Sequence, residues 1–122
     1  MTISRIITPF RRVVIESPYA GDIKANMAYL KIAMYDSIMR GEAPIASHKL
    51  YTDVLDDNDP EQRRLGIELG LSWLKVCDLV AFYTDLGMSP GMAACLGELK
   101  SLRFRVPFEM RKVREDVLSS IG

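Results

Sequence analysis

Residues 79–91 read LVAFYTDLGMSPG, and this stretch decides the fold. Its first five residues form an unbroken apolar run rich in β-favouring side chains, which predicts a buried strand over 79–83. Ser89 can cap a helix that begins at Pro90, because the first helical N–H has no partner within the helix and proline lacks it. The segment between them, with its glycine, is typical of a loop. The stretch therefore encodes a strand, a loop and a helix start.

The same order of strand, loop and helix is predicted near the N-terminus. The β-branched residues 13–15 predict a strand that ends before Ser17 and Pro18. Asp22 can cap the helix that follows, and Gly41 ends it. Apolar side chains recur in this helix at spacings of three and four, which indicates one buried stripe. The stripe consists of Ile23, Met27, Leu30, Met34 and Ile38.

The rest of the chain continues the alternation. The remaining expected elements are a strand over 44–49, a helix over 60–76, a strand over 104–110 and a helix over 114–121. Strands that alternate with helices favour parallel pairing with right-handed crossovers. The predicted fold class is therefore α/β: a small doubly wound, Rossmann-like or flavodoxin-like, mostly parallel sheet of about four strands with helices on both faces.

We assign residues 1–12 to an N-terminal arm and residues 13–122 to a single domain. In doubly wound sheets, ligands bind beyond the carboxyl ends of the strands, where the winding direction reverses. We therefore expect the loops after the strands over 13–15 and 79–83 to lie side by side and face one pocket.

Composition and charge exclude several classes of partner. The chain is 48% hydrophobic, and its 16 basic side chains balance 16 acidic ones. With no net charge, the chain has no overall electrostatic attraction to a nucleic acid polymer or a membrane surface. No apolar run reaches the roughly 20 residues of a membrane-spanning helix. Cys77 and Cys95 form no CxxC pair, which favours the reducing cytoplasm.

The helix over 60–76 has more apolar surface than one sheet covers. One stripe comprises Leu65, Leu69, Trp73 and Val76, and a second comprises Ile67, Leu71 and Leu74. An interface between subunits would cover both this helix and the N-terminal arm, which carries the basic residues Arg5, Arg11 and Arg12. We therefore expect a homo-oligomer, of which the symmetric dimer is the commonest form.

The loop after the first strand, residues 16–22 (ESPYAGD), is one candidate site. The Ser17 hydroxyl can hydrogen-bond a phosphate or a ribose hydroxyl, and Tyr19 offers an aromatic face to a base. A capped turn without a ligand explains the same residues equally well. The loop lacks the GxGxxG pattern of dinucleotide sites, so a nicotinamide is disfavoured and no cofactor is expected.

The loop after residues 79–83 is the second candidate site. Asp85 can act as a carboxylate or accept hydrogen bonds from ribose hydroxyls, while Ser89, Gly91 and the amides that start the next helix can cradle a phosphate. A helix cap alone explains Ser89 and Gly91 but not Asp85. His48, the only histidine, can shuttle a proton or bind a phosphate, although a single histidine without clustered ligands predicts no metal site.

These loops resemble those of the nucleoside 2-deoxyribosyltransferase superfamily, including small uncharacterised members in bacteriophage and bacterial genomes. The resemblance covers about residues 13 to 111 and rests on the order and spacing of its segments. The segments are Ser17-Pro18-Tyr19, Asn26, Ala46-Ser47-His48, Tyr51, Asp78 and Asp85-Leu86-Gly87-Met88-Ser89-Pro90-Gly91-Met92. It implies a Rossmann-like domain that binds nucleosides or nucleotides, with a site often completed by a neighbouring subunit.

The resemblance also implies roles for individual residues. Tyr19 would stack on the base, Asp85 and Asn26 would hold sugar hydroxyls, and Ser89 with Gly91 would cradle a phosphate. The full set expected to bind substrate is Ser17, Pro18, Tyr19, Asn26, His48, Ser89, Gly91 and Met92.

The chain departs from the superfamily at its catalytic glutamate. Enzymes of the superfamily cleave N-glycosidic bonds with a glutamate in the helix after the third strand, and Gly91 stands at that position here. Glu98 lies two turns further along and is too distant. The carboxylates that remain as catalytic candidates are Asp85, Glu16 and Glu109. Hydrolysis needs only a carboxylate that activates water, so a hydrolase is less affected than a transferase.

Two main functions remain open. The first is a nucleotide- or nucleoside-binding domain that acts on the N-glycosidic bond of a nucleoside monophosphate or a related small nucleotide. The second is a non-catalytic binder that sequesters a nucleotide signal, including one used in host defence, and the missing glutamate favours it. An interaction module with a vestigial cleft is a third possibility.

Overall fold

The computed structural model describes residues 10–101 and 105–121. Its elements are β1 (Arg11–Glu16), α2 (Ile23–Met39), β2 (Glu42–Ile45), α3 (Pro60–Ser72), the 3-10 helix η1 (Trp73–Lys75), β3 (Leu79–Tyr83), α4 (Pro90–Lys100), β4 (Phe108–Arg111) and α5 (Glu115–Ile121). The strands form one all-parallel sheet in the order β2-β1-β3-β4. This confirms the predicted α/β fold class.

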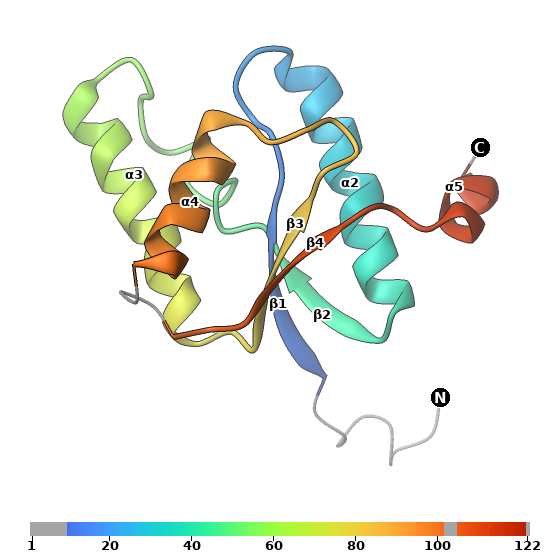
Figure 1. The fold of residues 1–122 in the computed structure, drawn as a ribbon. Helices are drawn as coiled ribbons and strands as arrows, with labels where there is room; N and C mark the ends of the chain where they lie inside the picture. The colour runs from blue at the N-terminus through green and yellow to red at the C-terminus, as the bar shows by residue number, and fades with distance from the viewer. Residues whose placement is uncertain (1–9, 102–104, 122) are drawn as a thin grey trace.

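Helices cover both faces of the sheet (Figure 1). Alternate strand residues face opposite sides, so Val13 and Ile15 pack with Tyr29 and Ala33 of α2, and Val14 packs on the other face. Val117 of α5 belongs to the α2 side. The α4 side contains Val14, Val80, Phe82, Met92, Cys95 and Leu99. No helix within the described ranges is long and apolar enough to cross a membrane.

Three strand boundaries differ from the sequence-based expectation. β1 begins at Arg11, so the last two residues assigned to the arm belong to the sheet and pair with β2; residues 1–9 of the arm lie outside the described part of the chain. β2 spans Glu42–Ile45 rather than 44–49, because Gly41, at φ +84°, turns the chain directly from α2 into the strand. β4 starts at Phe108 rather than at residue 104.

The predicted apolar stripe of α2 is confirmed in its middle, where Leu30 is buried and Met27 and Met34 pack against the core, and was wrong at its two ends. Ile23 and Ile38 are about half exposed, at 47% and 52%. The buried residues of α2 are Asn26, Tyr29, Leu30, Ala33, Asp36 and Ser37, of which only Leu30 belongs to the predicted stripe. Three of these six are polar, and each has hydrogen-bond partners in or beside the sheet. The helix therefore turns a partly polar side toward the sheet.

Two apolar side chains of α3 remain about half exposed, while Leu71 packs against the core. Leu65 and Ile67 are 49% and 54% exposed, and Val76 beyond η1 is 53% exposed. Gly70 is the residue of α3 that is fully buried, where a Cβ would meet the Ser47 carbonyl oxygen at 3.4 Å. The expected homo-oligomer interface on this helix stays a prediction.

Candidate functional site

The candidate site lies at the carboxyl edge, which we define as the ends of β1, β2 and β3 with the loops that follow them (residues 16–22, 46–48 and 84–89). β1 pairs with β3 in parallel, from Val13 opposite Leu79 to Glu16 opposite Phe82. β2 lies on one side of β1 in the sheet, and the next strand of the chain, β3, lies on the other side of β1. The loops after β1 and β3 therefore emerge from adjacent strands at the point of reversal, as the sequence predicted (Figure 1).

Glu16 is the last residue of β1 and is 7% exposed. Burial raises the pKa of its carboxyl group from 4.5 to about 8, and a hydrogen bond with Cys95 of α4 opposes this only in part. The Cys95 thiol, whose pKa is itself raised by burial and by the neighbouring Glu16, is protonated at neutral pH. Glu16 is therefore mainly a neutral carboxylic acid near pH 7, packed beneath the first turns of α4.

Ser17 and His48 connect the loops after β1 and β2. The Ser17 Oγ lies 3.3 Å from the His48 Nε2, and Ser17 is 4% exposed. Burial lowers the pKa of His48 from 6.5 to about 4, so the ring is neutral at pH 7. The nearby Ile15 backbone acts to raise this pKa, against the effect of burial. Among the described residues, the buried Nδ1 of His48 has no hydrogen-bond partner. A neutral ring with one spare nitrogen can accept or donate one further hydrogen bond.

Asp85 lies in the loop after β3, where Gly87, at φ +88°, allows the tight turn. Its Oδ1 accepts a hydrogen bond from the Tyr29 hydroxyl at 2.5 Å, and the Val113 N–H lies 3.1 and 3.3 Å from Oδ1 and Oδ2. Burial and the Asp85 carboxylate raise the pKa of Tyr29, which keeps its hydroxyl protonated. Asp85 thus ties its loop to α2 and to the segment after β4, and it keeps acceptor capacity for a ligand.

Asn26 holds the loop after β1 in place. Its Nδ2 donates hydrogen bonds to the Tyr19 and Ala20 carbonyl oxygens at 3.0 and 2.9 Å. Pro18 and Tyr19 are half-buried in this loop. The amide nitrogen of Asn26 is therefore committed to the loop, and the predicted contact with a sugar hydroxyl can come only from its oxygen.

We expect Asn26→Ala to loosen this loop. The Tyr19 and Ala20 carbonyl groups would lose their common donor in a partly buried setting, which costs about 1 kcal/mol in the free energy of unfolding. Amide hydrogen exchange should rise at residues 19–21, and urea unfolding should report the lost stability. Asn58→Ala, an exposed position before α3, should change stability by less than about 0.5 kcal/mol. Equal effects of the two variants would contradict the assigned role.

The three remaining binding residues are placed at the start of α4. The Ser89 Oγ accepts a hydrogen bond from the Met92 N–H at 3.2 Å, as expected of a helix cap. Gly91 is exposed in the first turn. Met92 is 1% exposed in the core beside Phe82, so the structure does not offer its side chain to a ligand.

Glu109 lies apart from the carboxyl edge. It stands opposite Ala81 within the sheet, and its Oε1 accepts a hydrogen bond from the Arg111 Nε at 2.6 Å. The structure therefore brings Glu16, Ser17, His48 and Asp85 to the carboxyl edge and does not bring Glu109 there. Among residues 10–101 and 105–121, no three His, Cys, Asp or Glu side chains form a group that could hold a metal ion.

A buried polar network, missed by the sequence reasoning, lies beneath α2. It consists of Asp36, Ser37, Glu42, Tyr83 and Arg111. Arg111 Nη1 and Nη2 each donate to a carboxylate oxygen of Glu42 at 2.7 Å, and Ser37 Oγ donates to Glu42 Oε1 at 2.8 Å. The Tyr83 hydroxyl donates to Asp36 Oδ2 at 2.5 Å and accepts from Arg111 Nη1 at 3.2 Å.

Two arginines at its rim complete the hydrogen bonds of Asp36. Arg40 Nε donates to Oδ2 at 2.7 Å, and the N–H and Nε of Arg114 donate to Oδ1 at 3.1 and 3.2 Å. Burial alone would raise the pKa of Asp36, but the donors, Tyr83 first, outweigh it and hold this pKa below its usual value. Burial and Asp36 raise the pKa of Tyr83 to about 12. With its hydrogen bonds filled from within the chain, the network has a structural role. The signal in the sequence was the Asp36-Ser37 pair between apolar helix residues.

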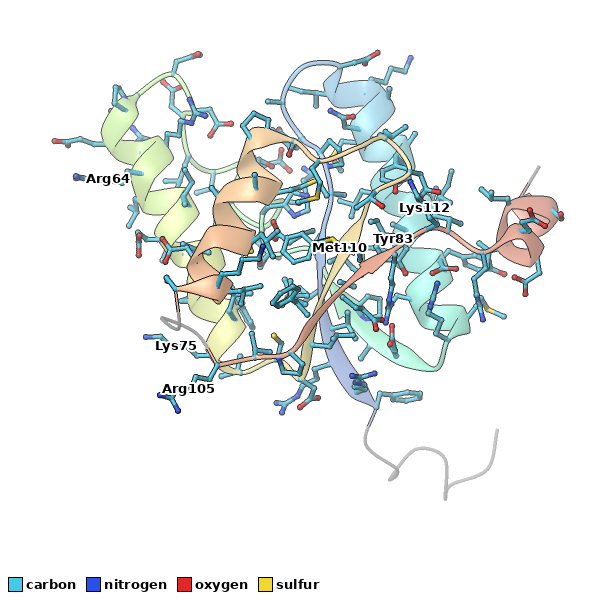
Figure 2. All side chains as sticks on the ribbon, viewed as in Figure 1. Arg64, Lys75, Tyr83, Arg105, Met110 and Lys112 are labelled. Atoms are coloured by element: carbon cyan, nitrogen blue, oxygen red, sulfur yellow. The ribbon has the colours of Figure 1, made fainter. Side chains whose placement is uncertain are left out.

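Two shallow hollows in the described surface contain none of the predicted site residues. One is lined by Asp57, Asn58, Pro60, Arg63, Arg64 and Ile67 at the start of α3, where Figure 2 labels Arg64. The other is lined by Phe10, Arg11, Arg12 and Asp78 at the amino ends of the strands. Neither adds a residue to the carboxyl edge.

The comparisons with known proteins identify a family of undescribed function. The family model described as Domain of unknown function (DUF7768) matches residues 11–109. This range includes every predicted site residue. No curated protein matches the chain.

Proposed function

Since this chain belongs to the DUF7768 family of domains of unknown function, we propose from its own geometry that it binds a nucleoside or a small nucleotide between the loops after β1 and β3. The observation that carries the proposal is the parallel pairing of β1 with β3 at the reversal of the sheet. In open α/β sheets this is the place where ligands bind.

The side of the site formed by β1 and β2 suits the uncharged part of such a ligand. Glu16 and His48 are both neutral near pH 7, and Ser17 adds a hydroxyl. Neutral donors and acceptors of this kind match sugar hydroxyls and base edges, whereas a phosphate requires positive charge. Tyr19, half-buried in the same loop, supplies the aromatic face for the base.

The side formed by β3 and α4 suits a phosphate. Pro90 has no N–H and the Met92 N–H is bound by the Ser89 Oγ, so a phosphate here would meet the Gly91 N–H and the positive end of the helix dipole. Lys112 donates from Nζ to the Thr84 carbonyl oxygen at 2.9 Å, which places an ammonium group beside the loop after β3. We therefore expect nucleoside monophosphates to bind more tightly than the corresponding nucleosides.

Calorimetry with nucleosides and nucleoside mono- and diphosphates tests the proposal. Tyr19→Ala should weaken binding about 5- to 140-fold, because base stacking contributes about 1–3 kcal/mol. Tyr35→Ala, at a 41% exposed tyrosine on α2 that is not part of the carboxyl edge, should bind like the unmodified chain. Absence of binding at millimolar concentrations, or an equal loss in both variants, would refute the proposal.

Hydrolysis of the N-glycosidic bond is a second candidate function, favoured by the state of Glu16. A carboxylic acid with a pKa of about 8 can protonate a leaving base at neutral pH, as the acids of glycosidases do. Incubation with nucleoside monophosphates followed by chromatography should then release free base, and Glu16→Gln should stop the release without abolishing binding. Intact ligand recovered after denaturation of the protein would instead support sequestration.

A further inference from the structure

The outer edge of β4 exposes unpaired backbone groups. On its inner side, the carbonyl oxygens of Pro107 and Arg111 accept hydrogen bonds from Val80 and Thr84 of the β3 segment, each at 2.9 Å. Because successive residues of a strand direct their backbone groups to opposite sides, Phe108 and Met110 direct theirs away from β3. Within the described residues no strand pairs with this edge.

The side chains at this edge do not protect it. Phe108 and Met110 are 38% and 48% exposed, on the face where Phe108 contacts Phe82 edge-on with ring centroids 6.1 Å apart. Figure 2 labels Met110 on β4, where it stands opposite Phe82 of β3. The opposite edge strand, β2, contains Pro44, a residue that blocks further pairing. Lys112, which could guard β4, turns its ammonium group back to the Thr84 carbonyl.

We infer that a second copy of this chain pairs with β4, antiparallel and about a twofold axis at Met110, so that the two sheets become continuous. A twofold axis normal to the sheet keeps each side chain on its own face, so an odd-numbered residue can only stand opposite an odd-numbered one. If the axis lay at Glu109, two glutamates would stand opposite each other. If it lay at Arg111, two arginines would stand opposite each other. Both arrangements bring like charges together.

The axis at Met110 is favoured by charge. It places Glu109 of each copy opposite Arg111 of the other, at the close spacing of a non-hydrogen-bonded antiparallel pair. The Arg111 side chain is 4% exposed and its guanidinium is bound by Glu42 and by Glu109 of its own chain, so this axis sets opposite charges across the interface without requiring a new ion pair. The backbone groups of Met110, which point outward, then pair with those of the second Met110. This inference does not depend on the proposed ligand.

Sedimentation across a range of concentrations tests whether this edge is the interface. The unmodified chain should form dimers. Met110→Lys should be monomeric, because the two lysines at the axis would repel each other, and its circular dichroism spectrum should be unchanged. Ile67→Lys, at a 54% exposed position on α3, is the matched control and should remain dimeric. A chain that is monomeric at every concentration, or a dimer broken by Ile67→Lys and not by Met110→Lys, would overturn the inference.

A cysteine cross-link tests the register. In a hydrogen-bonded antiparallel pair the Cα atoms lie about 5.5 Å apart, within the range that a disulfide spans. Met110→Cys should therefore form a covalent dimer under mild oxidation, seen on a non-reducing gel. The unmodified chain, with Cys77 and Cys95, and Leu118→Cys, 46% exposed on α5, serve as controls. Cross-linking of Leu118→Cys but not of Met110→Cys would exclude this register.

Discussion

Arg111→Met is expected to lower the free energy of unfolding by about 3–5 kcal/mol, the usual cost of removing one partner from a buried ion pair. The Arg111 and Glu42 side chains are only 4% and 7% exposed, and they share two hydrogen bonds of 2.7 Å. Without the guanidinium, Glu42 would lose its ion-pair partner and keep only the weaker attraction of Arg11, and Tyr83 would lose a donor. Urea unfolding followed by circular dichroism measures the loss.

Two variants make this result specific to the network. Lys49→Met removes an ion pair whose partner, Asp53, has an 85% exposed side chain, so it should cost less than about 1 kcal/mol. Arg111→Met combined with Glu42→Leu removes both buried charges and should recover part of the stability, because the carboxylate left without its arginine, Glu109, is 45% exposed and stays solvated. A cost of Arg111→Met no larger than that of Lys49→Met would show that the network contributes little to stability.

The elements with local signals were predictable from the sequence. The run 79–83 forms β3, and the Asp59-Pro60 and Ser89-Pro90 pairs start α3 and α4 at the expected residues. In each case the cause lies within a few neighbouring residues: an apolar run, a side chain that caps a helix, or a proline at the first helical position. The parallel sheet then follows from the alternation of strands and helices.

The inner side of α2 was not predictable in this way. Apolar periodicity assigned Ile23 and Ile38 to the core, but burial of Asp36 depends on Tyr83 and Arg114, which are 47 and 78 residues away in the chain. A polar residue is buried in a helix only when such distant donors meet it. No periodicity within the helix carries that information, so the polar part of its buried side was missed.

The candidate site was predictable in its position more than in its chemistry. The adjacency of the loops after β1 and β3 follows from topology, so the sequence alone places Ser17 and Asp85 at one edge. Their partners could not. The hydrogen bonds from Tyr29 to Asp85 and between Ser17 and His48 join segments that the sequence gives no reason to pair. The same holds for the contact between Glu16 and Cys95, which depends on how α4 packs over β1.

Glu16→Gln is expected to stabilise the protein in alkaline solution and to change how stability depends on pH. In the folded chain burial raises the pKa of this carboxyl group from 4.5 to about 8, so the folded state binds the proton more tightly than the unfolded state. The favourable contribution of the protonated acid is complete below pH 4.5 and is lost as the pH rises through about 8. At about 1.4 kcal/mol per pKa unit, the loss is on the order of 3–5 kcal/mol.

Gln has the shape of the protonated acid and cannot ionise, so the variant should lack this decline between pH 5 and pH 8. Urea unfolding at a series of pH values therefore yields two curves that separate as the pH rises. His48→Gln tests a pH dependence of the opposite sign. The pKa of His48 falls from 6.5 to about 4 on folding, so the contribution of neutral His48 to stability is present above pH 6.5 and is lost as the pH falls toward 4. Parallel curves for Glu16→Gln and the unmodified chain would mean that Glu16 is ionised in the folded protein, and the acid required for N-glycosidic hydrolysis would then be absent from the carboxyl edge.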